Sequence, residues 1–86
     1  MFTGIIETLG RVARVEKDQG NLHLTLESPL ASELQIDQSL AHNGVCLTVV
    51  DLSPGAYTVT AVAETLRRSN LGDLRSGGPV NLERAM

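Results

Sequence analysis

Strict alternation of apolar and polar side chains is the feature of this 86-residue sequence that most limits its possible folds. Four runs alternate with a period of two, which places their apolar side chains on one face of an extended strand. The apolar members are Leu22, Leu24 and Leu26; Val45, Leu47 and Val49; Tyr57, Val59 and Ala61; and Val80 and Leu82. Each run therefore predicts a strand with one face towards a core and a mixed face pointing away.

Turn-forming residues separate the predicted strands. Such residues fill the segments 18–21, 53–55 and 76–79, which contain the sequences DQGN, SPG and SGGP. The loop at 53–55 is short, so it predicts a hairpin between a strand over 45–52 and a strand over 56–62.

Two further segments predict short helices. The first spans 29–34 and follows Ser28, a good N-cap residue with proline in the first turn. The second spans 64–70, places acid before base along the helix dipole and ends near Gly72. About six short strands with two short helices predict an all-β fold, a six-stranded antiparallel closed barrel formed by one domain over residues 1–86. Closure would remove exposed sheet edges. An open two-sheet sandwich is the alternative.

Composition excludes several classes of function. The net charge is −3 and the seven basic residues are scattered, which argues against a nucleic-acid surface. Phe2 and Tyr57 are the only aromatic residues, too few for a platform that stacks bases. The single cysteine excludes an intramolecular disulfide and a thiolate zinc site, and no metal is expected. Residues 1–7 contain no basic region followed by a long apolar run, so we expect a cytoplasmic protein without membrane contact.

The single cysteine lies in the middle of a predicted strand. If Val45, Leu47 and Val49 face the core, then Cys46 and Thr48 share the opposite face, about 7 Å apart. Thr60 and Val62 lie on the corresponding face of the hairpin partner. Ser39 and His42 lie just upstream, near the mouth of the same strand, and Asn43-Gly44 is typical of a turn. The four side chains of Cys46, Thr48, Thr60 and Val62 would line a shallow patch outside the barrel. Taken alone, residues of these types more often have structural roles than bind a ligand, and they identify no ligand.

Four segments of the sequence resemble one known family, the riboflavin synthase alpha chain. They are MFTGIIE at 1–7, SLAHNGVCLTV at 39–49, ETLRRSNLGDL at 64–74 and VNLERAM at 80–86. Their order and spacing match across the whole chain, which makes the combination specific. The resemblance implies a Greek-key barrel and an enzyme that moves a four-carbon unit between two molecules of 6,7-dimethyl-8-ribityllumazine. The products would be riboflavin and 5-amino-6-ribitylamino-pyrimidinedione, and no metal or organic cofactor is implied.

The resemblance also implies site residues. It assigns Ser39 and Cys46 as catalytic groups that form hydrogen bonds or relay protons. It assigns Thr48 and Thr65 as groups that position the substrate, and Phe2 as packing that shapes the site. The strand at Thr60 and Val62 would offer backbone groups to the edge of the ring. Members of this family carry two barrels in tandem, and a complete site forms between the first barrel of one subunit and the second barrel of another.

This sequence ends at Met86, where the first barrel of the family finishes. We therefore expect either a fragment or a single-barrel protein that pairs with itself. The expected assembly is a dimer of single barrels, or a trimer if the chain is part of a tandem-barrel protein. The alternative function is a non-catalytic carrier of lumazine or riboflavin, similar to the lumazine proteins of luminous bacteria. The intact CLT and ETLR sequences favour the enzyme.

Overall fold

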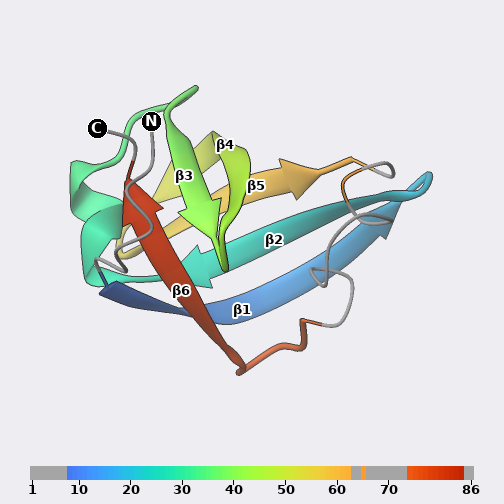
Figure 1. The fold of residues 1–86 in the computed structure, drawn as a ribbon, viewed down its shortest axis with the longest axis horizontal. Coiled ribbons are helices and arrows are strands. Elements are labelled where there is room, and N and C mark those ends of the chain that lie inside the picture. Colours follow the sequence, from blue (N-terminus) through green and yellow to red (C-terminus); the bar gives the residue numbers. More distant parts are fainter. Residues whose placement is uncertain (1–7, 63–64, 66–73, 85–86) are drawn as a thin grey trace.

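The computed structural model describes residues 8–62, 65 and 74–84, and its strands form a closed antiparallel barrel (Figure 1). The strands are β1 (Thr8–Asp18), β2 (Asn21–Glu27), β3 (Ser39–His42), β4 (Val45–Ser53), β5 (Ala56–Ala61) and β6 (Pro79–Arg84). Their order around the barrel is β1-β2-β5-β4-β3-β6. The prediction of a closed six-stranded barrel is confirmed, and the open sandwich is excluded.

The barrel has Greek-key topology. Strands β3, β4 and β5 pair in succession. The strand that precedes them in the chain, β2, pairs with β5 and not with β3. The predicted hairpin is the pair β4 and β5. The connection from β2 to β3 therefore has to cross from one side of the barrel to the other, and a short helix lies in this connection.

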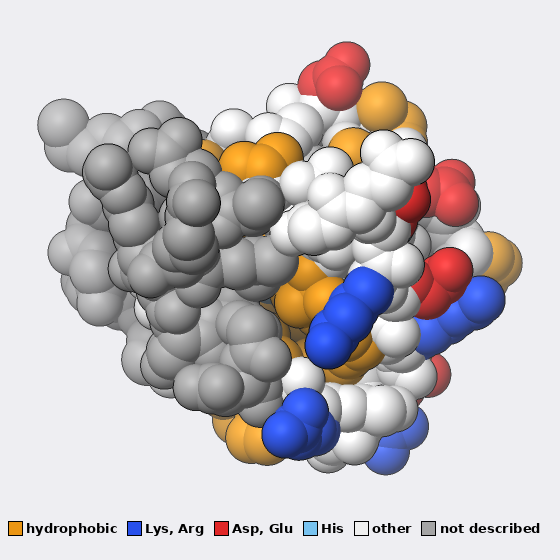
Figure 2. Space-filling model, turned by 90° about the vertical axis from the view of Figure 1, so that its right-hand side faces the viewer, with side chains coloured by type: hydrophobic (Ala, Val, Ile, Leu, Met, Phe, Trp, Pro, Cys, Tyr) orange, Lys and Arg blue, Asp and Glu red, His pale blue; other side chains and the backbone are white. Residues whose placement is uncertain are grey.

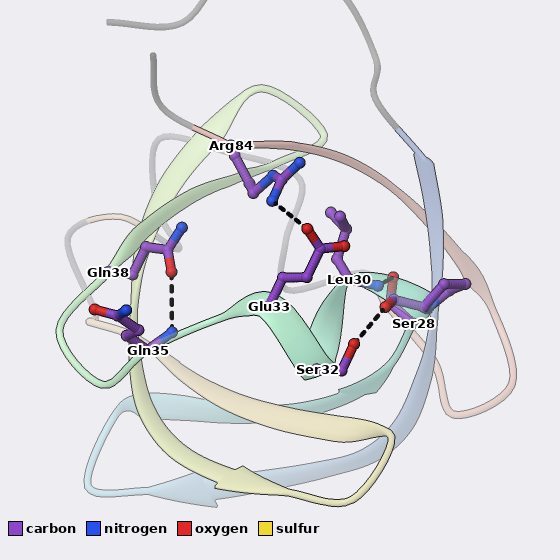
Figure 3. A network of polar contacts seen from close by, with 8 residues as sticks. Ser28, Leu30, Ser32, Glu33, Gln35, Gln38 and Arg84 are labelled. Carbon is purple, nitrogen blue, oxygen red and sulfur yellow. Dashed lines mark hydrogen bonds and ion pairs between the residues drawn. The ribbon is translucent and has the colours of Figure 1, made fainter.

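That helix, η1 (Pro29–Glu33), lies across one end of the barrel (Figure 3). The side-chain oxygen of Ser28 caps it by accepting a hydrogen bond of 3.1 Å from the backbone N–H of Leu30, as the sequence predicts. The helix is of the 3₁₀ type, which is common for one-turn connectors. Arg84 of β6 donates to Glu33 at 3.2 Å and ties the helix to the barrel wall. No helix in the described part of the chain is long and apolar enough to span a membrane.

Aliphatic side chains fill the interior. The buried cluster consists of Val12, Leu22, Leu24, Leu26, Leu30, Ala31, Leu34, Leu40, Leu47, Val49, Tyr57, Val59, Ala61, Val80 and Leu82. It contains every apolar residue of the four alternating runs except Val45, which is half-buried and packs against the cluster. The alternation in the sequence therefore predicts the inner face correctly.

Two tight turns set the register of the hairpins. Gln19-Gly20 has φ angles of 51° and 86°, and Asn43-Gly44 has φ angles of 51° and 85°. Positive φ at both central residues identifies type I′ turns, whose twist matches the twist of the paired strands. Asn43 also contacts β6: its N–H donates to the Asn81 carbonyl, and its Oδ1 accepts from the Asn81 N–H, both at 2.8 Å. The turn between β3 and β4 is thus attached to the last strand.

The first strand bends so that it can pair with β6 at its start and with β2 further on. Ala13 is an extra residue between the paired positions Val12 and Arg14, and such a bulge bends a strand locally. Closer to the start of β1, a Cβ atom on Gly10 would lie 2.8 Å from Cδ1 of Leu82. Glycine therefore allows β1 and β6 to approach closely where the barrel closes.

Candidate functional site

The outer face of β3 and β4 carries a thiol and two hydroxyls. Cys46 and Thr48 are exposed, while Leu47 between them is buried, so both point away from the core. Ser39 pairs with Thr48 across the two strands. Directly opposed residues of an antiparallel pair project to the same face, which places Ser39 on the outside as well. The structure thus brings Ser39, Cys46 and Thr48 together on one outer surface.

The polar surface continues onto β5. Val49 pairs with Val59. In this antiparallel pair Thr48, which precedes Val49, and Thr60, which follows Val59, lie next to each other on the outward face. Val62 follows the end of β5 and is 50% exposed. Ser39, Thr48 and Thr60 therefore form a row of hydroxyls across β3, β4 and β5.

A histidine on β2 extends this row. His23 pairs with Thr60, and its Nδ1 lies 2.8 Å from the Thr60 hydroxyl. Its Nε2 lies 3.4 Å from Oδ2 of Asp18 at the end of β1. The sequence analysis identified neither His23 nor Asp18 as a site residue. The alternation of segment 21–27 does place His23 outward, but its contact with Thr60 depends on β2 lying beside β5.

The second histidine lies inside the barrel. The Nδ1–H of His42 donates to the Leu40 carbonyl at 3.0 Å, and its Nε2 accepts from the Tyr57 hydroxyl at 2.9 Å. Burial lowers the pKa of His42 from 6.5 to about 4 and raises the pKa of Tyr57 above its ordinary value. His42 is therefore neutral at pH 7. It faces away from Ser39 and Cys46, so it is not available as a base for a ligand on the outer face.

Two of the predicted site residues have few or no described surroundings. Thr65 is half-buried and has a helical backbone, but the rest of the predicted helix at 64–70 lies outside the described residues. Phe2 also lies outside them. Within the described ranges 8–62 and 74–84 and Thr65, no group of three or more His, Cys, Asp or Glu side chains is placed to hold a metal ion.

Charged side chains of both signs lie on the described face shown in Figure 2. Acidic groups lie mainly in the upper right of this view and basic groups mainly in its lower half, where polar and apolar side chains lie between them. Three of the described arginines pair with acids: Arg11 with Glu27 at 2.8 Å, Arg14 with Glu16 at 2.9 Å and Arg84 with Glu33 at 3.2 Å. These ion pairs neutralise part of the positive charge of the described residues, in a chain whose net charge is −3.

Fold and surface together define a small closed β-barrel that presents a thiol, hydroxyls and an imidazole on its outer wall and keeps an aliphatic interior. Sequence comparison places it more closely. The chain belongs to the lumazine binding domain family, whose family model matches residues 3–85.

Similar proteins include the riboflavin synthase of Mycobacterium tuberculosis (strain ATCC 25618 / H37Rv), which is 51% identical over 87 residues. This match covers 99% of the chain and 43% of that protein. The riboflavin synthase of Bacillus subtilis (strain 168) is 41% identical, over 100% of the chain and 40% of that protein. The chain thus spans about two-fifths of the length of these relatives.

The fold is also similar to that of LumP, solved in complex with 6,7-dimethyl-8-(1'-D-ribityl) lumazine. The TM-score is 0.92 at 23% sequence identity, over all of this chain and 48% of LumP. A second LumP structure, in complex with riboflavin, gives a TM-score of 0.91 at the same identity, over 98% of this chain and 46% of LumP.

Proposed function

We propose that this chain is the N-terminal lumazine-binding barrel of a riboflavin synthase. The reaction takes two molecules of 6,7-dimethyl-8-ribityllumazine and moves a four-carbon unit from one to the other. It yields riboflavin and 5-amino-6-ribitylamino-pyrimidinedione. One observation carries this proposal: Ser39, Cys46 and Thr48, which lie in one of the segments shared with riboflavin synthases, project together onto the outer face of the barrel.

The chemistry requires little more than positioning, hydrogen bonds and proton transfer. The C7 methyl of the lumazine is acidic because its carbanion is delocalised into the ring, so the substrate supplies its own reactivity. The protein has to hold two flat rings in a fixed relation, which replaces a bimolecular encounter by an effectively unimolecular one. It also has to place hydrogen-bond donors where negative charge develops, and to relay protons.

In the proposed site Ser39 and Cys46 act as hydrogen-bonding or proton-relay groups near the reacting carbons. Thr48 and Thr65 position the ring, while the strand at Thr60 and Val62 offers backbone groups to its polar edge. Phe2 provides apolar packing. The outward direction of Cys46, Thr48 and Thr60 supports these roles, since a group that faces the aliphatic core could not contact a ligand outside it.

The site of one barrel holds one ring, and the reaction needs two. The relatives are more than twice as long as this chain, and we propose that a second barrel supplies the facing half-site. That barrel would belong to a tandem chain within a trimer, or to a second copy of this chain in a two-fold dimer. The proposal includes a cytoplasmic location, which suits a protein whose only cysteine is an exposed thiol, and no metal or organic cofactor.

The test is to incubate the purified chain with 6,7-dimethyl-8-ribityllumazine and to follow riboflavin fluorescence, both for the chain alone and for its mixture with the isolated second barrel of a riboflavin synthase. Riboflavin formed by the mixture, but not by that partner alone, would support the enzyme. Saturable binding without product in either arm would favour the carrier. Absence of binding at micromolar lumazine would contradict both functions.

A further inference from the structure

The hydrogen bonds of His23 select one tautomer. Asp18, as a carboxylate, can only accept, so its 3.4 Å contact with Nε2 requires the proton to be on Nε2. In the neutral ring Nδ1 is then an acceptor. The Thr60 hydroxyl, 2.8 Å away, must donate its single proton to Nδ1.

The surroundings of His23 support this assignment. Glu16 is the residue opposite His23 on β1, but its carboxylate pairs with Arg14 at 2.9 Å. Asp18 is therefore the carboxylate that contacts the ring. His23 is held on both nitrogens, although its side chain is one-third exposed at 33%.

The consequence appears at Thr60. Because its proton is directed to His23, its oxygen presents only lone pairs to the outside of the barrel. A threonine without such a partner can rotate its hydroxyl to donate or to accept. Thr60 is thus fixed as an acceptor, in the row of hydroxyls that includes Ser39 and Thr48.

We propose that His23 is a positioning residue that acts through Thr60 and makes this part of the site selective for a ligand edge with an N–H donor. This inference rests on the proposed function. The pyrimidinedione edge of the lumazine presents an imide N–H between two carbonyls, and the strand of Thr60 is the one proposed to meet that edge. The backbone of β5 can serve the carbonyls, and the oxygen of Thr60 accepts from the imide N–H.

The chain provides a matched control. Thr25 lies two residues from His23 on the same face of β2, and its hydroxyl lies 3.1 Å from that of Thr58 on β5. This pair joins the same two strands and is similarly half-buried, but it lies one step further from Thr48. Loss of a polar contact between β2 and β5 can thus be separated from loss of the acceptor at Thr60.

The test compares binding of 6,7-dimethyl-8-ribityllumazine with binding of its analogue methylated on the imide nitrogen, by fluorescence titration. The native chain should prefer the unmethylated compound about tenfold, the worth of one good hydrogen bond. His23→Val should reduce this preference about fivefold, because the Thr60 hydroxyl can then rotate. His23→Asn should restore it, since the amide oxygen can accept in place of Nδ1, and Thr25→Val should leave it unchanged. Urea unfolding of each variant shows whether it is folded.

The outcomes separate the two proposals. If the native chain binds the lumazine and His23→Val keeps the native preference, the role of His23 is overturned while the proposed function stands. If the native chain binds neither compound, the proposed function fails and the inference fails with it. A ligand-free measurement adds an independent check: ¹⁵N chemical shifts of the ring, assigned with His23→Asn, should show a protonated Nε2 and a bare Nδ1. A protonated Nδ1 would overturn the inference even if the ligand binds.

Discussion

His42 and His23 lie on opposite sides of the barrel wall and show how the same side chain serves two purposes. Each has both ring nitrogens within hydrogen-bond distance of a partner. His42 is completely buried, and its partners are buried with it. The side chain of His23 is one-third exposed, and its partner Thr60 keeps an outward oxygen. Inside, the hydrogen bonds can contribute only to stability. Outside, they can also shape what a ligand meets.

The largest difference in stability between the two histidines should appear when the buried ring of His42 is removed. His42→Ala leaves a cavity and deprives the Tyr57 hydroxyl of its acceptor, and we expect a loss of about 3 kcal/mol in the free energy of unfolding. His23→Ala should cost less than about 1 kcal/mol, because water can replace the ring. Urea denaturation of both variants measures the difference, and equal losses would contradict the comparison.

The second expected effect is a pH dependence of stability that originates at His42. Its pKa is about 4 when folded and 6.5 in the exposed chain, so the unfolded state binds more protons between these values. Stability should be fully present above pH 6.5 and fall as the pH decreases towards 4, by about 2 kcal/mol between pH 7 and pH 5. Other groups titrate in this range, so the measurement is the difference in slope between variants. His42→Gln should flatten the dependence, whereas Thr25→Val, which removes no titratable group, should keep it.

A smaller loss should follow from Tyr57→Phe. This change keeps the ring that packs in the core and removes only the hydroxyl, which leaves Nε2 of His42 without its donor. We expect a cost of about 1 to 2 kcal/mol in the free energy of unfolding, measured by urea denaturation. In the double variant with His42→Ala, the cost of Tyr57→Phe should largely disappear, because the pair is then already broken. Additive losses would show that the two side chains act independently.

The smallest effect on stability should come from the outer face, at Cys46. Cys46→Val substitutes an exposed side chain with a good strand former, so the free energy of unfolding should change by less than about 0.5 kcal/mol. Affinity for the lumazine should nevertheless fall, by up to about tenfold, and turnover in the mixture with the second barrel should fall further. A variant with native affinity and native turnover would show that the thiol has no part in the site.

The sequence predicts which side chains face inside or outside the barrel better than it predicts the contacts between neighbouring strands. Alternation alone places Leu47 and Val49 inside and Cys46 and Thr48 outside, because side-chain direction in a strand is a local property. The type I′ turn at Asn43-Gly44 is local as well and is indicated by its residue types. In contrast, His23 meets Thr60 only because a Greek key places β2 next to β5, and no periodicity encodes that order.

The misread residue is His42. Its neighbour Asn43 is correctly predicted as a turn residue, which suggested that the histidine also lies at the edge of the barrel. The turn contains only two residues, so β3 continues through His42, and the alternation from buried Leu40 turns its ring inward to Tyr57.

The first predicted helix exists but is a short 3₁₀ helix of five residues, because the connection between β2 and β3 only has to cover the end of the barrel.

The two hydrogen bonds between Asn43 and Asn81 have a consequence for how the barrel closes between β3 and β6. Strand β3 pairs with β6 at three positions. The side chain of Asn43 adds a further hydrogen bond to β6 from within the turn that follows β3. The residue at position 43 thus has to adopt a left-handed backbone conformation and also supply a side-chain carbonyl oxygen. Glycine meets the first demand only, and serine or alanine meets neither well. The pairing of β3 with β6 is therefore stabilised by Asn43, a residue that lies in neither strand.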